Sequence, residues 1–457
     1  MDYILLAIFV IGYVGIVLEH QIKIDKAATA LLTGTVLWGL FVTGYTEVPA
    51  HLADLFSFAS FSAYVPNASL SVFYEHRLLH HMQEISSILF FLLGAMTIVE
   101  LVDAHEGFRV ITDRINTSSK VKLMWIICIL TFFFSALLDN LTTSIVMISL
   151  LRKLIDDKET RWLFAGMVVV AANAGGAWSP IGDVTTTMLW IGGQLSTSVI
   201  IVNLIVPSIV AILVPLIILS FRLKGTVTRP VFDNDPNKES TTSFERNLVF
   251  AVGVCGLLFV PVFKTVTHLP PFMGMMLSLG VIWIVTERLH YAKNQEQRTE
   301  LSVIGVLKKI DVSSVLFFLG ILLAVAALQE AGHLIFAAES LRVALNDVYL
   351  IDLAIGLLSA IVDNVPLVAA SMGMYDVVPL DAVTDDWSRE FTKDGRFWQF
   401  LAYCAGTGGS ALIIGSAAGV AVMGLERIDF IWYLKKISLL AIAGYFAGAG
   451  VYILMFA

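Results

Sequence analysis

Charged side chains are scarce in this chain: Asp, Glu, Lys and Arg make up 14% of its 457 residues, whereas 57% are hydrophobic. A water-soluble domain carries roughly 25% charged residues to cover its surface. The chain has instead long apolar runs, and about 17 to 25 such residues cross a hydrocarbon core about 30 Å thick. Clear examples are Tyr3–Leu18, Ala27–Val42, Ile85–Leu101, Val199–Phe221 and Ile437–Phe456. The composition therefore excludes a soluble protein and predicts membrane helices.

Cysteine is also scarce. Cys128, Cys255 and Cys404 lie far apart in apolar stretches, which excludes a disulfide framework and a closely spaced thiolate metal site. The start, Met1-Asp2, lacks the basic segment of a cleaved signal, so we expect the first apolar run to be retained as a helix. The ten-residue alternation of an outer-membrane barrel is missing too. The predicted fold class is an all-α polytopic membrane protein.

Lysine and arginine predict how the chain sits in the membrane. If Tyr3–Leu18 crosses from outside to inside, most of the 29 lysines and arginines fall in cytoplasmic loops, as the positive-inside rule requires. We therefore expect a multi-pass protein of the inner (cytoplasmic) membrane with both termini external. Its expected surroundings are membrane lipid, with no nucleic-acid partner. The basic residues that do not fall inside are Arg77, Lys264, Arg342, Arg389, Lys393 and Arg396.

Two apolar stretches carry an Asp-Asn pair at their centres. Leu123–Leu151 contains Asp139-Asn140 and is basic on both sides, so a re-entrant helical hairpin that opens to the cytoplasm keeps both flanks inside. Tyr349–Val378 contains Asp363-Asn364 and has acidic or neutral flanks. It predicts a second hairpin, which opens outward.

Both stretches belong to an internal duplication. Phe134–Asn140 shares the pattern Ser-Ala-x-x-Asp-Asn with Leu358–Asn364, and Asn173–Asp183 aligns with Gly406–Ser416. An odd number of membrane crossings between the copies inverts the second copy. Inverted repeats with paired, glycine- or proline-interrupted segments are typical of secondary transporters.

Glycine and Pro180 predict two broken transmembrane helices, at Ala174–Gly182 and Gly406–Gly415. Unwound backbone at membrane depth survives only against protein or a water-filled cavity, so we expect these segments to meet the hairpin tips near the midplane. The alternative is that the glycines serve close helix packing alone. The predicted division of the chain is 1–84 N-terminal scaffold helices, 85–221 first repeat, 222–311 scaffold helices and loops, and 312–457 second, inverted repeat.

Oxygen-bearing side chains gather at these segments. A carboxylate inside a span is a functional hypothesis by default, and a buried carboxyl retains a proton more readily than an exposed one. Sodium and a proton would then compete for Asp139 and Asp183, with Asp363 in support. The alternative is that each Asp-Asn pair caps a broken helix. The predicted cation- and proton-binding residues are Asp139, Asn140, Thr142, Thr143, Asn173, Ser179, Asp183, Thr185, Thr186, Asp363, Asn364, Thr407, Ser410 and Ser416, with Na⁺ at Asp139, Asn140, Asp183 and Asn364.

Another group, His76, His80 and Glu84, shares one face of a helix, with His81 beside it. This spacing suits a metal site or an external pH sensor, and it equally suits a solvated helix start. Two further segments, Pro49–Tyr64 and Phe336–Leu345, are predicted as interfacial helices.

The motifs resemble those of the NhaD-type sodium/proton antiporters of the ion transporter superfamily. The similar segments are Leu137–Thr143, Asn173–Thr186, Val362–Pro366 and Gly406–Ala411, and the resemblance extends from about Ile85 to the C-terminus. It implies Na⁺ or Li⁺ exchange for protons in pH homeostasis, a homodimer with scaffold and transport domains, and elevator-like movement. It implies no enzymatic activity and no cofactor beyond the transported ions. The site residues it supports are Asp139, Asn140, Asn173, Asp183, Thr185, Asn364 and Ser410.

The predicted function is therefore secondary antiport by alternating access. A sodium-coupled anion carrier of the same superfamily, for dicarboxylate or arsenite, is the alternative. The carboxylates argue against it, because an anion prefers helix N-termini and neutral polar groups, although such carriers also need cation ligands. An intramembrane aspartyl protease is a remote alternative, because it gives no role to the Asn that follows Asp139 and Asp363.

Overall fold

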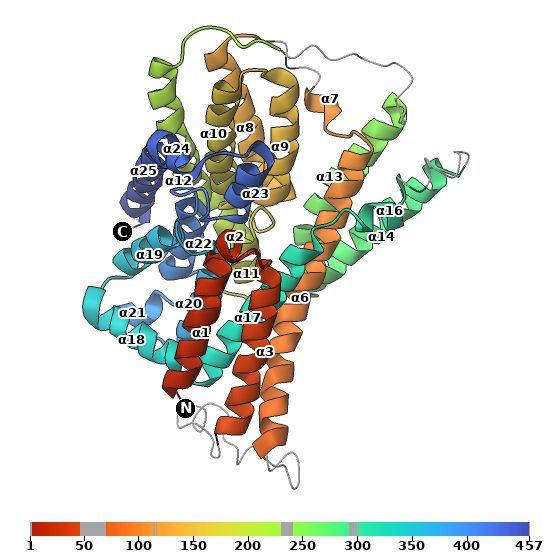
Figure 1. The fold of residues 1–457 in the computed structure, drawn as a ribbon. Coiled ribbons are helices and arrows are strands. Elements are labelled where there is room, and N and C mark those ends of the chain that lie inside the picture. The colour runs from red at the N-terminus through yellow and green to blue at the C-terminus, as the bar shows by residue number, and fades with distance from the viewer. Residues whose placement is uncertain are drawn as a thin grey trace. The chain divides into compact units, whose positions relative to one another are not determined.

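The computed structural model of the chain describes residues 2–45, 70–112, 115, 117–229, 241–291, 299 and 301–456. Within these ranges the chain is helical, and its β contacts are the isolated bridges Ser119–Thr226 and Val378–Thr392 (Figure 1). Eight of the described helices are long and apolar enough to cross a membrane. The protein is thus an all-α polytopic membrane protein, as predicted. The interfacial helix predicted at Pro49–Tyr64 lies outside the described residues.

The helices divide between two compact units. The first unit comprises residues 1–90, 311–347 and 365–377, and the second comprises the rest. Helices of the first unit are α1 (Asp2–Val17), α2 (Glu19–Ile22), α3 (Lys26–Gly44), the start of α6 (Leu70–Ala104), α17 (Val312–Glu330), α18 (His333–Leu345) and most of α20 (Asn364–Met374).

The second unit contains the end of α6 and the larger set of helices. These are α7 (Arg109–Thr112), α8 (Lys120–Leu138), α9 (Asn140–Leu154), α10 (Lys158–Gly176), α11 (Val184–Ile191), α12 (Thr197–Arg222), α13 (Ser243–Thr267), α14 (Pro271–Leu289), α16 (Val303–Leu307), α19 (Val348–Leu358), η2 (Leu380–Ala382), α21 (Asp386–Arg389), α22 (Arg396–Gly408), α23 (Ala417–Glu426), α24 (Phe430–Tyr433), the π-helical turn η3 (Leu434–Ser438) and α25 (Leu439–Phe456).

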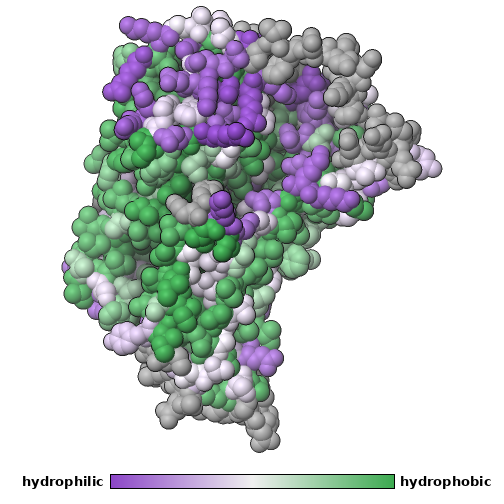
Figure 2. Space-filling model, in the orientation of Figure 1, coloured by the Kyte–Doolittle hydropathy of each residue, from purple (hydrophilic) through white to green (hydrophobic). Residues whose placement is uncertain are grey.

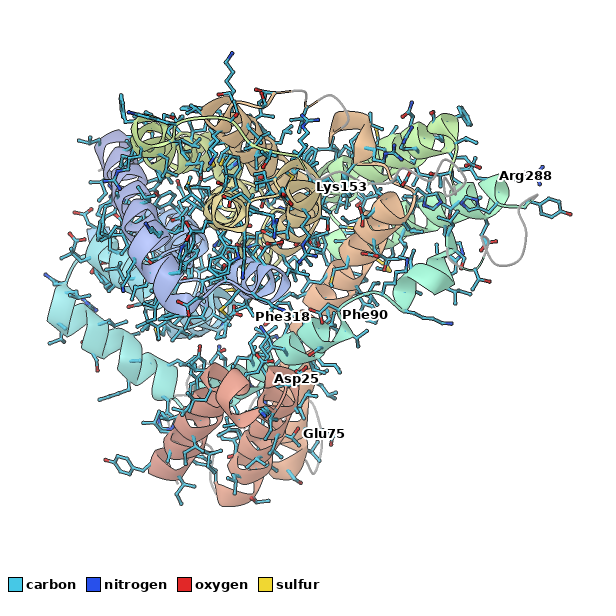
Figure 3. All side chains as sticks on the ribbon, turned by 45° about the horizontal axis from the view of Figure 1, so that its top comes forward. Asp25, Glu75, Phe90, Lys153, Arg288 and Phe318 are labelled. Carbon is cyan, nitrogen blue, oxygen red and sulfur yellow. The ribbon has the colours of Figure 1, made fainter. Side chains whose placement is uncertain are left out.

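Close approach of α3 and α17 organises the first unit. A Cβ added at Gly34 would lie 2.6 Å from the carbonyl oxygen of Gly320, so only glycine permits this separation. One turn further along α3, the indole of Trp38 donates to the carbonyl of Leu323 at 2.9 Å. Asp25, labelled in Figure 3, caps α3 and accepts a hydrogen bond from the hydroxyl of Ser313 at 2.7 Å. The two helices are therefore joined along their length.

The helix predicted at Phe336–Leu345 is present as α18, which begins at His333. Leu334 and Ala338 are buried, whereas Phe336 and Val343 are each 76% exposed. The helix thus has one buried and one exposed apolar face, and its place at a membrane interface stays a prediction.

In the second unit, α8 and α9 pack against each other and against α10, and the chain turns between them at Asp139. Lys120, at the start of α8, donates to the hydroxyl of Thr160 at 2.9 Å, and α9 ends shortly before Asp157 caps α10. Both basic flanks therefore lie at one end of this hairpin. Figure 2 shows hydrophilic residues gathered over that end, where Lys153 is labelled in Figure 3.

The two predicted helix breaks are present but shorter than expected. The chain leaves the helix after Gly176 and resumes it at Val184, and the second break lies between Gly408 and Ala417. The prediction that unwinding begins at Ala174 and Gly406 is wrong, because those glycine-rich turns stay helical and serve close packing. A Cβ at Gly175 would lie 2.2 Å from the carbonyl oxygen of Phe132, and one at Gly408 2.0 Å from that of Gly356.

The duplication is visible in individual contacts of the second unit. Ser135 donates to the carbonyl of Ala172 at 2.5 Å, and its repeat equivalent, Ser359, donates to the carbonyl of Ala405 at 2.9 Å. Gly182 approaches the carbonyl of Ser135, and Gly415 approaches that of Ser359 in the same way. The two halves therefore use one packing scheme, while the inverted orientation of the second half stays a prediction.

The second Asp-Asn stretch is also interrupted as predicted. Helix α19 ends at Leu358 and α20 begins at Asn364, so the break contains Asp363. Helix α19 belongs to the second unit and α20 beyond Asn364 to the first. That this stretch forms a hairpin opening outward stays a prediction.

Candidate functional site

Asp183 lies at the centre of the polar cluster and is 1% exposed. The chain places it in the first break, where its Oδ1 accepts the backbone N–H of Thr185 at 2.9 Å and so caps α11. Its Oδ2 accepts the amide of Asn140 at 2.7 Å and that of Asn364 at 3.4 Å. The carboxylate therefore gathers donors from both Asp-Asn turns and from its own helix.

Asn173 extends this cluster to the second break. Its Oδ1 accepts the amide of Asn140 at 3.1 Å. Its Nδ2 donates to the hydroxyls of Ser410 at 3.0 Å and Ser416 at 2.9 Å. Asn173 is fully buried, and Ser416 in turn caps α23 by accepting the N–H of Gly419 at 3.2 Å. One amide thus connects the two halves of the repeat.

Asp139 has a different environment from Asp183. Both of its carboxylate oxygens accept from Thr142, one from the backbone N–H and one from the hydroxyl, each at 2.8 Å. Its backbone has φ 80° and ψ 159°, a conformation that favours glycine. The contacts of Asp139 are those of a helix cap, and its strained backbone turns the chain so that Asn140 faces Asp183.

The other predicted ligands differ in what their oxygens contact. Ser179 donates to the carbonyl of Ala136 at 2.5 Å, and Thr186 donates to the carbonyl of Ser179 at 2.7 Å, so both stabilise the first break. Thr407 donates to the preceding turn of its own helix at Tyr403, at 2.6 Å. Among the described residues the buried hydroxyl of Thr143 has no hydrogen-bond partner.

Asp363 is half-buried and directly precedes Asn364. The structure therefore brings Asn140, Asn173, Asp183 and Asn364 into one hydrogen-bonded network. Asp139, Ser179 and Thr186 make hydrogen bonds that stabilise the local backbone, so they have structural roles.

The histidine-rich face of α6 is separate from this cluster. His76, His80 and Glu84 are exposed, and the described residues contain no group of three His, Cys, Asp or Glu side chains placed to hold a metal ion. Both the solvated helix start and pH sensing by these residues stay predictions. On the buried face, Glu330 accepts from Arg77 at 2.6 Å and lies 2.7 Å from Nε2 of His81.

Two further contacts of the helices that carry the cluster were not predicted. The hydroxyl of Tyr433 donates to the carbonyl of Ser410 at 2.9 Å, which orients the second break. Glu426 accepts from Arg152 at 2.7 Å and Arg161 at 2.8 Å, which joins the far ends of α9, α10 and α23. A sequence carries no local signal for such contacts, because the partners lie 23 residues apart in the first case and more than 260 residues apart in the second.

The chemistry of the cluster is that of a site for a small hard cation or a proton. Its polar atoms are carboxylate, amide and hydroxyl groups, and in the described part of the chain no Lys, Arg or His forms an ion pair with Asp183. Hard cations prefer such oxygen ligands. An anionic substrate would meet the Asp183 carboxylate without a compensating cationic side chain.

Comparison with known proteins gives a consistent assignment. Residues 13–387 match a family model described as "Citrate transporter". The chain is 46% identical to "Sodium/proton antiporter 1" of Arabidopsis thaliana, over 99% of this chain and 72% of that protein. "Sodium/proton antiporter 2" of the same plant is 45% identical, over 98% of each chain.

Bacterial relatives match over nearly the full length too. "Na(+)/H(+) antiporter NhaD" of Vibrio parahaemolyticus is 29% identical over 91% of this chain and 97% of that protein. The protein of the same name from Alkalimonas amylolytica is 27% identical over 99% of this chain and 90% of its own length. The chain matches the citrate transporter family model and belongs with the NhaD-type sodium/proton antiporters.

Proposed function

We propose that this protein exchanges Na⁺, or Li⁺, for protons across a membrane as a secondary antiporter, and that Asp183 carries the exchanged ions. The names of its plant and bacterial relatives, which are sodium/proton antiporters, support the reaction. The site itself supports the assignment to Asp183. The single observation that carries it is a buried carboxylate whose hydrogen-bond donors, among the residues that the structure describes, are neutral amide and backbone N–H groups.

A buried ionised carboxylate without a cationic partner costs several kcal/mol. Two ways of neutralising it are a proton on the carboxyl and a metal cation beside it. Both use the oxygens of Asp183, so one displaces the other. If only a neutralised site changes its access to the two sides of the membrane, each passage of sodium in one direction requires passage of protons in the other.

The amides around Asp183 suit both states. As neutral donors, Asn140 and Asn364 hold the carboxylate through their N–H groups. Each amide also carries an oxygen with two lone pairs, and rotation about its terminal bond presents that oxygen instead. Sodium would then be held by Asp183 with the oxygens of Asn140 and Asn364, and Asp139 would complete the predicted set.

The wider setting is proposed on the same basis. The basic loops favour the cytoplasmic membrane with both termini external. The duplicated contacts favour an inverted repeat that moves as a transport domain, with scaffold helices in 1–84 and 222–311. A homodimer is expected from the family resemblance.

The test uses purified protein in liposomes with an inside-acid pH gradient and a pH-sensitive dye. Addition of NaCl or LiCl should dissipate the gradient with the wild type and leave it intact with Asp183→Asn. Asp156→Asn is the matched control, because Asp156 is an exposed carboxylate just after α9. It should exchange at the wild-type rate. Equal activity of D183N and wild type would contradict the role given to Asp183.

The same preparation tests the anion-carrier alternative, which the description of the family model raises. Citrate is added to liposomes that have no pH gradient, once with and once without a sodium gradient. Sodium-driven citrate uptake, with no proton movement on addition of NaCl alone, would replace the exchange proposal. The absence of a cationic side chain paired with Asp183 in the described residues favours exchange.

A further inference from the structure

Lys264 makes two contacts with a single residue of the broken helix. It lies in the last turn of α13, where its ammonium group is half-buried. Nζ donates to the backbone carbonyl of Trp190 at 2.7 Å and lies 4.4 Å from the centre of the Trp190 ring. A charged hydrogen bond and a cation–π contact therefore act on the same partner.

Trp190 is in the last turn of α11, the helix that Asp183 caps. The final carbonyls of a helix have no partner within it and need one from outside. The carbonyl of Met188 accepts from Gly192 at 2.8 Å, and that of Leu189 accepts from Leu195 at 3.2 Å. The donor for Trp190 is Lys264, which belongs to another helix.

The length of α11 makes this contact relevant to the site. Its eight residues, Val184–Ile191, span about 12 Å at the usual rise of an α-helix. A helix so short and so well buried moves as one piece, so a displacement at Trp190 is transmitted to Asp183. The ammonium of Lys264 also faces the negative end of the helix dipole, while Asp183 faces its positive end.

Other groups around Lys264 are consistent with an anchor. The Trp190 ring is 1% exposed, and Phe91 contacts it edge-on with ring centres 6.3 Å apart. Helix α11 otherwise packs on α22, whereas α13 packs on α14 and α8. Lys264 is therefore a polar link between α13 and the broken helix.

We propose that Lys264 is a positioning residue for transport. It fixes the C-terminal end of α11 and so keeps the carboxylate of Asp183, at the other end, within hydrogen-bond distance of Asn140. The inference rests on the proposed function, because that function makes Asp183 the residue that binds the cation. Loss of the ammonium leaves α11 free to shift, and the three donors to Asp183 no longer converge. Sodium affinity falls as a result, while the conformational step that sets the maximal rate is left intact.

The experiment compares Lys264→Gln, Lys264→Arg and wild type in the liposome assay, over a series of NaCl concentrations. K264Q should raise the half-saturating sodium concentration about tenfold, as expected for a lost charged hydrogen bond, with the maximal rate within about twofold. K264R should restore affinity, because guanidinium also donates to a carbonyl and stacks on an indole. Lys224→Gln is the control, since Lys224 is an exposed loop lysine.

The outcomes separate this inference from the proposed function. A K264Q protein with wild-type half-saturation, whether or not its maximal rate or melting temperature falls, would show a merely structural lysine and overturn the inference. Failure of K264R to restore affinity would also overturn it. If the wild type itself shows no proton movement with sodium or lithium, the proposed function fails and this inference falls with it. Melting temperatures measured with and without NaCl confirm that each variant is folded.

Discussion

The amide of Asn173 donates to the hydroxyl of Ser410 at 3.0 Å, across 237 residues of sequence. Asn173 belongs to the first broken helix and Ser410 to the second break. The same amide reaches Ser416 and accepts from Asn140, so one side chain links three segments of the cluster. Because each of these groups is buried, loss of the amide removes hydrogen bonds of Asn140, Ser410 and Ser416 that water does not readily replace.

Asn173→Ala should therefore impair both stability and transport. We expect a clearly lower melting temperature and a half-saturating sodium concentration raised about tenfold or more, since unpaired buried groups cost about 1–3 kcal/mol each. Asn203→Ala is a matched control, because Asn203 pairs with Gln399 at 2.8 Å away from the cluster. Equal effects of the two substitutions on sodium affinity would contradict a specific role for Asn173.

Protons and sodium should compete in a way that depends on Asp183. If both occupy one carboxylate, the half-saturating sodium concentration should rise about tenfold for each unit of falling pH once the site is mostly protonated, by linkage. The sign follows because the proton-bound state must release its proton before sodium binds. Initial rates at several pH values and NaCl concentrations check this, and a half-saturation that does not change with pH would contradict competition at one site.

Asp139 allows its backbone and its carboxylate to be tested separately. Asp139→Ala keeps a Cβ at φ 80° and loses the cap of α9, so it should be destabilised by about 1 kcal/mol. Asp139→Gly loses the same cap and also relieves the backbone strain, which is worth about 1–3 kcal/mol. D139G should therefore melt at a higher temperature than D139A. The reverse order would show that the positive φ carries no cost here.

The paired glycines should respond alike in the two halves. Gly175→Ala and Gly408→Ala each place a Cβ within 2.2 Å of a backbone oxygen, so both should be destabilised by about 1–3 kcal/mol or more. Gly280→Ala, in α14, meets nothing within 4 Å and should be neutral or stabilising. Thermal unfolding in detergent checks the order. Tolerance of alanine at only one of the two paired positions would contradict equivalent packing in the repeat.

Glu330 should be important for the stability of the first unit. It is fully buried between Arg77 and His81, and breaking a buried pair on one side typically costs about 3–5 kcal/mol. Glu330→Gln should lower the melting temperature strongly. Glu106→Gln, which removes a partner of Arg109 in a half-exposed pair, should change stability by about 1 kcal/mol or less. Similar shifts for both variants would contradict the structural role of the buried pair.

Much of the candidate site could be predicted because its chemistry is local in the sequence. Asp139-Asn140, Asp183 and Asp363-Asn364 are polar residues inside apolar runs. Burying such residues in a membrane costs free energy, so they are predicted as functional even when their spatial neighbours are unknown. The duplicated Ser-Ala-x-x-Asp-Asn pattern also predicts that two turns of the chain have equivalent structures and roles. The pattern does not show which carboxylate lies at the centre of the cluster and which one caps a helix. The structure gives Asp139 the contacts of a cap and Asp183 the central position.

The sequence by itself determined the all-α membrane class, the approximate positions of the breaks and the residue types of the cluster. These follow from hydropathy, helix-breaking residues and the cost of buried charge, which act over a few neighbouring residues. Only the tertiary structure decided that Asn173 joins Ser410 and Ser416, that Glu426 joins two arginines, and that Lys264 donates to Trp190 in the helix that Asp183 caps. Such contacts depend on which helix faces meet, and helix packing sets that between residues that are distant in the chain.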